Sequence, residues 1–277
     1  MIASRRQSIL IHLFLLIVLL IVLGPLLYTL MTSLKLLRDM FSGSFFFTPT
    51  LANYEELFFG RRSNFLLLTR NSIITGLGSM LVILFVASLG AYSLSRFRWR
   101  RLYSGLIMGW LVFVHMLPPI IFVGPYYLNT RALGIYDTPL ATIMAHTILN
   151  LPLAFWMLHS FFSEVPPELE EAAAIDGCGY FKRFTHIVLP LARPGIAATA
   201  VLVFIFSWKE FLFALSLTST ANANTIPIGI ASFAQEYNIR YGEMAAAAFF
   251  ATIPAIFMVA FAQRHIVKGL TLGALKG

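Results

Sequence analysis

The chain has 277 residues, of which 58% are hydrophobic and 12% are charged, with a formal net charge of +8. This composition excludes an ordinary soluble domain, because one soluble core is too small to bury so much apolar sequence, whereas a membrane helix bundle has no such limit. The single cysteine, Cys178, excludes an intrachain disulfide and a metal site built from paired thiols. We therefore expect an all-α membrane protein, folded as one domain over residues 1–277.

Charged residues interrupt the apolar sequence at intervals close to one bilayer crossing, for which a helix needs about 20 mainly apolar residues. This spacing predicts six spans, at about residues 9–31, 71–95, 103–126, 139–162, 194–217 and 244–263. The first span follows Arg5 and Arg6, as a cleaved signal peptide would. Its uncharged run is too long for such a peptide, however, and no small-residue cleavage site follows. We interpret it as an uncleaved anchor.

The distribution of Lys and Arg predicts the orientation. Twelve lie on the side of the N-terminus, seven lie on the other side, and Lys209 falls inside a span. The twelve are Arg5, Arg6, Arg96, Arg98, Arg100, Arg101, Lys182, Arg183, Arg193, Arg264, Lys268 and Lys276. Because basic residues accumulate in short cytoplasmic loops, both termini should be cytoplasmic. Topology then explains the positive charge, and no nucleic-acid partner is expected.

The first outer segment and the third span each contain residues that predict local structure. We expect the first outer segment, residues 32–69, to be partly ordered by aromatic side chains, such as Phe45, Phe46, Phe47 and Tyr54. In the third span, His115 precedes Pro118 and Pro119, and this proline pair predicts a kink or break about halfway across. Irregular backbone at membrane depth is tolerated where it lines a cavity, so His115 and Pro118 are candidates for the lining of a solute path.

The six histidines show no spacing typical of metal ligands, so the sequence predicts neither a metal site nor a metal enzyme. For the histidines inside spans, among them His146, packing or hydrogen bonds between helices are the favoured roles.

The connection over residues 163–193 has a helical pattern of its own. Pro166 and Pro167 suit a first helical turn, the acidic residues after them suit the positive end of a helix dipole, and Gly177 is placed to end the helix. Those acidic residues are Glu168, Glu170 and Glu171. A second short helix is expected over about residues 180–187, before Pro190 and Pro194 break the chain. The pattern alone fits either a partner-binding helix with a small-residue face or a solvated connecting helix.

Lys209 and Glu210 lie about 15 residues into the fifth span, or roughly 22 Å from its start at 1.5 Å per residue. Ionisable groups at such depth usually face a bundle interior or a water-filled path. Alternatively, the helix ends early and the pair reaches the outer interface.

The 163–193 connection resembles a known motif. Glu171-Ala172-Ala173, then Gly177 after three residues, then Ile187-Val188-Leu189-Pro190 after nine more, are similar to the EAA loop of binding-protein-dependent importer permeases. Other strings, in order along the chain, resemble the sugar-type branch of this family, close to the maltose permeases. They are Asn53-Tyr54, Asn71-Ser72, the run from Ala91 to Phe97, Ser207-Trp208, the run from Glu210 to Phe213, and the run from Val267 to Thr271.

The resemblance implies a type I ABC importer permease fold and a set of partners. In the family, this loop forms a coupling helix that docks on a cytoplasmic ATPase, which implies that role for Leu169, Glu171, Ala172, Ala173, Asp176 and Gly177. The implied partners are a second, homologous permease, two cytoplasmic ATP-binding cassette subunits, and a periplasmic or lipid-anchored solute-binding protein, assembled in a bacterial inner membrane. No cofactor is implied for this chain, since ATP is held by the partners.

The implied substrate is a carbohydrate or a derivative of one. Related sugar permeases usually have Asn where this chain has Lys209, which suggests an anionic sugar derivative as solute. Trp208 would then offer an apolar face to the sugar ring. The tentative pathway residues are His115, Pro118, Trp208, Lys209, Glu210 and Phe213.

No Gly-x-x-x-x-Gly-Lys sequence occurs, so the chain has no P-loop of its own for ATP. Two other functional classes, a secondary transporter and a membrane-embedded enzyme, have weaker support. An ion-gradient-driven secondary transporter would commonly show internal repeats and several buried acids, and neither is evident here. A membrane-embedded enzyme would need a nucleophile and a base at a useful spacing, which the sequence does not offer.

Overall fold

The computed structural model describes residues 5–235 and 238–274, with the backbone alone for residues 5–7, 235, 238, 261, 262 and 264–274. Of the twelve basic residues that predict the orientation, Lys276 lies outside the described residues, as do the side chains of Arg5, Arg6, Arg264 and Lys268. The chain forms two compact units, unit 1 with residues 1–66 and 229–253, and unit 2 with residues 67–228 and 254–277. The single domain over residues 1–277 stays a prediction.

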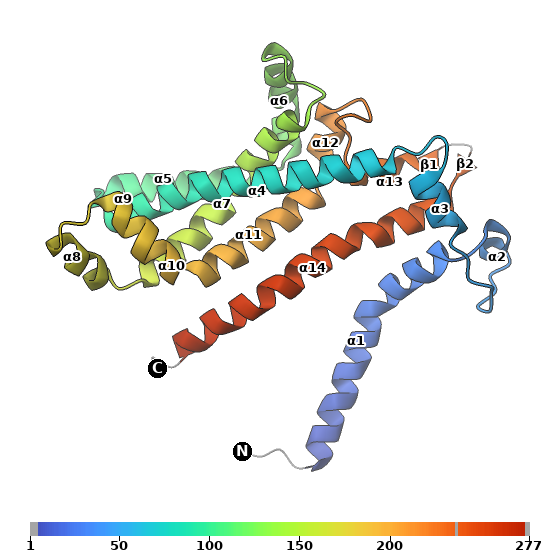
Figure 1. The fold of residues 1–277 in the computed structure, drawn as a ribbon, viewed down its shortest axis with the longest axis horizontal. Coiled ribbons are helices and arrows are strands. Elements are labelled where there is room, and N and C mark those ends of the chain that lie inside the picture. The colour runs from blue at the N-terminus through green and yellow to red at the C-terminus, as the bar shows by residue number, and fades with distance from the viewer. Residues whose placement is uncertain (1–4, 236–237, 275–277) are drawn as a thin grey trace. The chain divides into compact units, whose positions relative to one another are not determined.

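The expectation of an all-α fold is confirmed (Figure 1). The exception among the described residues is one hairpin, whose two strands have two residues each. Unit 1 holds α1 (Arg5–Ser33), α2 (Leu37–Phe41), α3 (Ala52–Phe59) and the hairpin of β1 (Ala234–Gln235) and β2 (Asn238–Ile239). Unit 2 holds α5 (Arg101–Met116), α6 (Ile120–Ala132), α7 (Pro139–Glu164), α8 (Pro167–Ile175), α9 (Tyr180–Arg183), the π-helix η1 (Phe184–Val188), α10 (Leu189–Leu191), α11 (Arg193–Trp208) and α12 (Leu212–Leu217). Three helices cross the boundary between the units, namely α4 (Phe65–Arg96), α13 (Ile226–Ser232) and α14 (Tyr241–Ala274).

Four to six spans can be traced among the described residues. Four helices are long and apolar enough to cross a membrane, Ser8–Ser33, Phe65–Arg96, Pro139–Glu164 and Tyr241–Ala260. Two bent helix pairs, Arg101–Met116 with Ile120–Ala132 and Tyr180–Leu191 with Arg193–Trp208, bring the number to six if each pair counts as one span. The six-span prediction agrees with this count.

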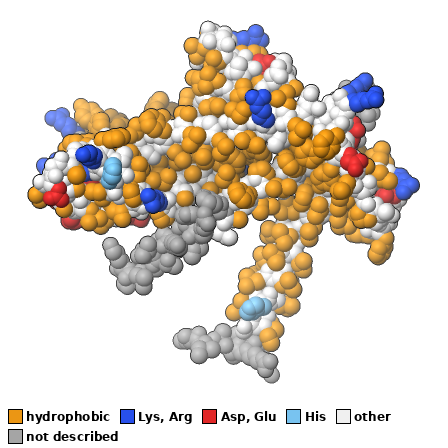
Figure 2. All heavy atoms as spheres, viewed as in Figure 1, with side chains coloured by type: hydrophobic (Ala, Val, Ile, Leu, Met, Phe, Trp, Pro, Cys, Tyr) orange, Lys and Arg blue, Asp and Glu red, His pale blue; other side chains and the backbone are white. Residues whose placement is uncertain are grey.

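In unit 1, α1 presents its apolar side chains to the outside. Its 18-residue apolar window has a mean hydropathy of 3.0 and no buried residue. Hydrophobic side chains cover this helix in Figure 2. A helix that is apolar all round and buries nothing within its own chain is suited to a lipid environment or to another membrane helix.

The segment after α1 is ordered chiefly by Asn53 and Tyr54. The Asn53 side-chain amide donates hydrogen bonds to the carbonyls of Ser33 and Lys35, both at 2.8 Å, and the Tyr54 hydroxyl lies 2.8 Å from that of Ser33. Of the other aromatics expected to order this segment, Phe47 lies under the Lys35 ammonium, but Phe45 and Phe46 are exposed. The prediction was therefore right for Tyr54 and wrong for Phe45 and Phe46.

The core of unit 2 lies between α4, α7 and α11. Ile83 and Ala87 of α4, Leu158 of α7 and Val203 of α11 are fully buried there. Close approach of α4 depends on glycine, because a Cβ on Gly90 would lie 2.7 Å from the ring of Phe155 on α7. Small residues allow such close helix packing within a membrane, where apolar burial alone does not drive association.

The break at the proline pair is confirmed. α5 ends at Met116, α6 begins at Ile120, and the two helices are bent by 98° relative to each other. Pro119 precedes the first residue of α6. Backbone N–H groups at a helix start have no partner within the helix, so the missing N–H of a proline costs no hydrogen bond there.

Two predicted boundaries were wrong. α4 begins at Phe65, so Asn71 and Ser72 lie one to two turns inside the helix rather than at its start. There, the Asn71 amide donates to the carbonyls of Ala221 and Asn224, both at 2.9 Å, and the Ser72 hydroxyl accepts the N–H of Ile226 at 2.8 Å. The fifth span, expected to continue to residue 217, ends at Trp208, and a separate helix α12 follows.

Candidate coupling surface and solute cavity

α8 forms where the sequence predicts a helix in the 163–193 connection. Pro167 occupies the first turn, with Glu168 and Glu170 beside it. The helix ends at Ile175, and Gly177 follows with a φ of +80°, a conformation that glycine adopts without strain. The N–H of Cys178 donates to the carbonyl of Ala173 at 2.9 Å, which completes the turn that closes the helix.

A buried ion pair attaches α8 to α4. The Glu170 carboxylate accepts hydrogen bonds from the Arg96 guanidinium at 2.5 Å and from the Tyr92 hydroxyl at 2.6 Å. Tyr92 and Arg96 are four residues apart on α4, so both side chains lie on one face of that helix. Sequence reasoning treated Glu170 only as a dipole charge and missed this contact.

Arg96 also holds the end of α7. Its second nitrogen, Nη2, donates to the carbonyls of Phe162 at 2.9 Å and Val165 at 2.7 Å. One guanidinium thereby satisfies carbonyls at the end of α7 and the carboxylate of α8. α4, α7 and α8 are thus joined at one point by charge-assisted hydrogen bonds, which are about twice as strong as neutral ones.

With Glu170 buried, the rest of α8 is turned outward. Leu169, Glu171, Ala172, Asp176 and Gly177 are exposed, and Ala173 is half-buried. These six residues, predicted as coupling residues, are called the α8 surface below. Ile175 adds a side chain that is 88% exposed. Leu169, at 46% exposed, is the second large apolar side chain open on this helix.

The second helix of the connection is longer than expected. It was predicted over about residues 180–187, but α9, η1 and α10 run without interruption to Leu191, and the chain then bends by 78° into α11. Pro190 does not end the helix. A proline has no N–H, so it leaves one carbonyl of the preceding turn without its α-helical partner. Here that turn is a π-helix, in which the carbonyls pair with different N–H groups, and the proline is accommodated.

A cavity of about 200 Å³ lies in unit 2 beside the break between α5 and α6. Its lining includes His115, Phe122, Tyr126, Asn150, Phe206 and Glu210. Aromatic faces together with an amide and a carboxylate are the groups that bind a polyhydroxylated ring, the aromatics through its C–H face and the polar groups through its hydroxyls.

Glu210 forms one wall of this cavity and is held by three contacts. His146 Nε2–H donates to its carboxylate at 2.9 Å. The same carboxylate accepts the backbone N–H groups of Phe213 at 3.0 Å and Ala214 at 3.2 Å, at the start of α12. Glu210 thereby satisfies N–H groups that a helix start leaves free, which favours a new helix at Leu212. The expected hydrogen-bonding role of His146 is confirmed.

The predicted pathway residues do not all meet at this cavity. His115 and Glu210 line it, whereas Pro118 is exposed outside it. Lys209 is also exposed and outside the lining, with its ammonium 4.7 Å above the ring of Phe206, a wall residue.

Two other predicted pathway residues are buried away from the cavity, and their role stays a prediction. Trp208 is 5% exposed and stacks on Phe204, and Phe213 is fully buried against Tyr126. Neither ring is open to a solute in this structure. For Phe213 the cause is the early end of α11, because the residues after Trp208 no longer follow the helical positions on which the prediction was based.

Known proteins place these features in a family. Residues 83–272 match the family model described as "Binding-protein-dependent transport system inner membrane component". The chain is 38% identical over 232 residues to the trehalose transport system permease protein SugB of Mycobacterium tuberculosis, covering 83% of each chain. It is 34% identical over 229 residues to the sulfoquinovosyl glycerol transport system permease protein SmoH of Agrobacterium fabrum, covering 83% of this chain and 79% of that protein.

Among solved structures, a chain of a bacterial ABC transporter involved in the import of the acidic polysaccharide alginate has the same fold. The TM-score is 0.79 at 21% identity, over 95% of this chain and 99% of the other. Sequence and fold thus agree with the resemblance carried by the EAA-like loop. This protein is an integral inner-membrane transport subunit and belongs to the family of inner membrane components of binding-protein-dependent transport systems.

Proposed function

We propose that this chain is one of two homologous permeases in an ATP-driven ABC importer for a carbohydrate or carbohydrate derivative. Its α8 surface docks on a cytoplasmic ATPase subunit, and its cavity forms part of the solute path. A second ATPase and a periplasmic or lipid-anchored solute-binding protein complete the assembly. ATP is bound and hydrolysed by the partners, and this chain performs no covalent chemistry.

The observation that carries the proposal is the way α8 is held. It is fixed on one side by Glu170, while the α8 surface on the other side is free of contacts that would bury it. A helix that receives force from a partner needs both properties, a rigid attachment to the bundle and an open face. A merely solvated connecting helix needs neither.

The proposed orientation has both termini in the cytoplasm. It is supported by the excess of Lys and Arg in the short segments on the side of α8. The α8 surface then faces the cytosol, where an ATPase can reach it.

The carbohydrate class is supported by the cavity lining and by the relatives, whose names refer to trehalose and to sulfoquinovosyl glycerol. We propose further that the solute carries a negative charge, recognised by Lys209 as it leaves or enters the cavity. The ammonium of Lys209 stands over Phe206, next to the cavity wall, and is open to a ligand.

Copurification tests the coupling role. A tagged chain should bring down its ATPase, and Ala172→Trp should reduce the recovered ATPase by about tenfold or more, because a bulky ring at the centre of an interface costs at least 1.4 kcal/mol. Leu133→Trp is the control, since Leu133 is exposed at the end of α6 and lies outside the α8 surface. Equal ATPase recovery with both variants would contradict the docking role.

Transport assays test the charge preference separately. Lys209→Asn should lower uptake of a sugar sulfonate or uronate relative to uptake of a neutral disaccharide. If the ratio of the two uptake rates is unchanged, the anionic solute is wrong and the importer role is unaffected.

A further inference from the structure

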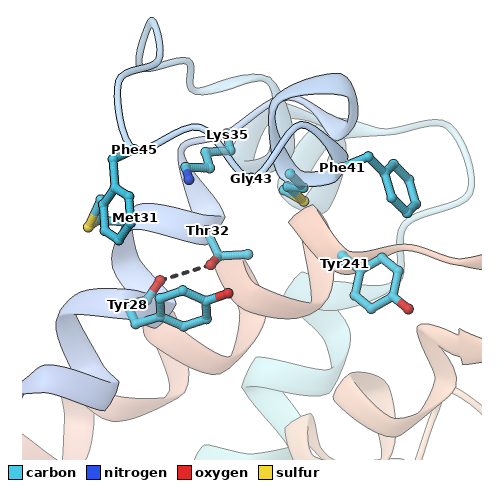
Figure 3. Close-up of a pocket in the computed structure, with 9 residues that line it drawn as sticks. Tyr28, Met31, Thr32, Lys35, Phe41, Gly43, Phe45 and Tyr241 are labelled. Carbon is cyan, nitrogen blue, oxygen red and sulfur yellow. Dashed lines mark hydrogen bonds between the residues drawn. The ribbon is translucent and has the colours of Figure 1, made fainter.

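A second cavity, remote from the coupling surface in the sequence, lies in unit 1 at the end of α1. Its volume is about 390 Å³, within the range of roughly 300–1,000 Å³ that is usual for small-molecule sites. Figure 3 shows its lining, with Tyr28, Met31, Thr32 and Lys35 from the last turns of α1 and the residues after it, and Tyr241 from the start of α14. Phe41, Gly43 and Phe45 close it from the α2 segment.

The chemistry of the lining is one-sided. Lys35 brings a positive charge, Tyr28 and Tyr241 bring phenol hydroxyls, and no Asp or Glu belongs to the described lining. The Lys35 ammonium lies 4.9 Å from the centre of the Phe47 ring and donates one hydrogen bond to the carbonyl of Ser44 at 2.8 Å, so the ammonium keeps hydrogen-bonding capacity for a ligand. An anion is therefore the ligand that these groups favour.

The rest of the lining is apolar and open. Tyr28, Phe41 and Phe45 are 70%, 75% and 77% exposed, and Met31 lies one turn after Tyr28 on α1. A small hydrophilic anion gains nothing from such a rim, whereas an anion attached to hydrocarbon does. The combination matches an amphiphile with a charged head.

The depth of the cavity fits the same ligand. The apolar part of α1 from Ile9 to Met31 is roughly 33 Å long at 1.5 Å per residue, close to the roughly 30 Å hydrocarbon core of a bilayer. Lys35, one turn beyond it, then lies at headgroup level. Tyr and Lys are the residues that anchor helices at this interface.

We propose that this cavity binds the phosphodiester headgroup of an anionic phospholipid, with Lys35 as the charged contact and the aromatic rim against the upper acyl chains. Bound lipid would fix the end of α1 against the start of α14, since Tyr28 and Tyr241 line the same cavity. The orientation of the chain sets the leaflet from which this lipid comes.

Native mass spectrometry of the purified, complete transporter tests the site. The transporter is placed in nanodiscs of phosphatidylglycerol and phosphatidylcholine mixed in equal parts, and the retained lipid is identified. We expect phosphatidylglycerol to be retained preferentially, and Lys35→Gln to reduce this preference by about fivefold, the effect of one basic residue at a membrane surface. Lys35→Arg, which keeps the charge, should restore it.

Arg38→Gln is the matched control, because Arg38 carries the same charge three residues along, is largely exposed and does not belong to the lining. An equal loss of lipid preference in Lys35→Gln and Arg38→Gln would mean general attraction to the surface and overturn the site. The proposal also fails if the wild-type transporter shows no preference, or if glycerol phosphate in solution displaces the lipid completely, since the site would then select a soluble anion. Recovery of all subunits with each variant shows that the assembly is intact.

Discussion

Arg96 and Glu170 are 74 residues apart in the chain, yet their side chains form an ion pair in which they are only 12% and 6% exposed. Removal of one partner leaves the other charge in a poorly solvated place. A pair of this kind is therefore sensitive to change on either side, whatever its net contribution to folding.

Glu170→Gln should lower the free energy of unfolding by about 3 kcal/mol, the lower end of the range for a buried pair that loses one charge. Tyr92→Phe, which removes a single hydrogen bond to the carboxylate, should cost about 1.5 kcal/mol. Denaturant titration of the purified chain in detergent measures both. Glu168→Gln, an exposed carboxylate on the same helix, is the control and should change stability by less than about 0.5 kcal/mol. If all three variants behave alike, the ion pair is not what holds α8.

Gly90→Ala should destabilise unit 2 by about 1–3 kcal/mol, because the added Cβ would lie 2.7 Å from the Phe155 ring and overpack the contact between α4 and α7. Gly109→Ala in α5 is the matched control. Nothing lies within 4 Å of a Cβ there, so alanine should stabilise the helix by about 0.5–1 kcal/mol. Thermal unfolding of the two variants should therefore shift in opposite directions, and a shift in the same direction would contradict the packing described for α4.

Asp137 should make stability depend on pH. Burial by itself would raise the pKa of this carboxyl, but hydrogen bonds from the N–H groups of Ser219 and Thr220 and from the Thr220 hydroxyl outweigh it and hold the pKa below its ordinary value of 3.8. The folded chain therefore binds this proton more weakly than the unfolded chain. The resulting stabilisation is fully present above pH 3.8 and is lost as the pH falls through the lower pKa of the folded state.

Asp137→Asn isolates that effect, because asparagine tolerates the positive φ of 60° at this position. The stability difference between wild type and variant should be largest at neutral pH and should shrink toward pH 3. A difference that is the same at both pH values would show that the charge of Asp137 contributes nothing.

His146 and Glu210 should be energetically coupled. A double-mutant cycle with His146→Gln and Glu210→Gln should give an interaction energy of about 1 kcal/mol or more in unfolding experiments, as expected for residues in direct contact. Additive effects, within about 0.3 kcal/mol, would mean that the hydrogen bond between them does not stabilise the fold.

Cys178 offers a test of the orientation without an added thiol, because it is the only cysteine and lies directly after Gly177. Its side chain is partly exposed. A membrane-impermeant maleimide should label it in inverted vesicles and not in spheroplasts, and Cys178→Ser should abolish the signal. Added ATPase subunits should slow the labelling if the α8 surface is their docking site. Labelling in spheroplasts would place the connection on the outer face and contradict the proposed function.

The features that could be predicted from the sequence are those that act through their own backbone. Pro118 and Pro119 break the third span because they lack N–H donors, and Gly177 ends α8 because it adopts a positive φ. These effects need no knowledge of what lies nearby in space. The positions of the spans follow from hydropathy for the same reason.

Contacts between distant residues could not be predicted in this way. Arg96 with Glu170 and His146 with Glu210 join helices whose relative rotation is set by packing, for which one sequence gives no direct signal. Phe213 shows how one such contact spreads: Glu210 holds the first N–H groups of the separate helix α12, so Phe213 takes a position that a continuous helix would not give it.

α7 links the two sites of unit 2. Its carbonyl at Phe162 is bonded to Arg96, and its His146, sixteen residues earlier, is bonded to Glu210 at the cavity wall. At 1.5 Å per residue these points are roughly 24 Å apart along a single rod. A tilt of α7 imposed at Phe162 would therefore displace His146, and with it the carboxylate of Glu210 at the cavity wall.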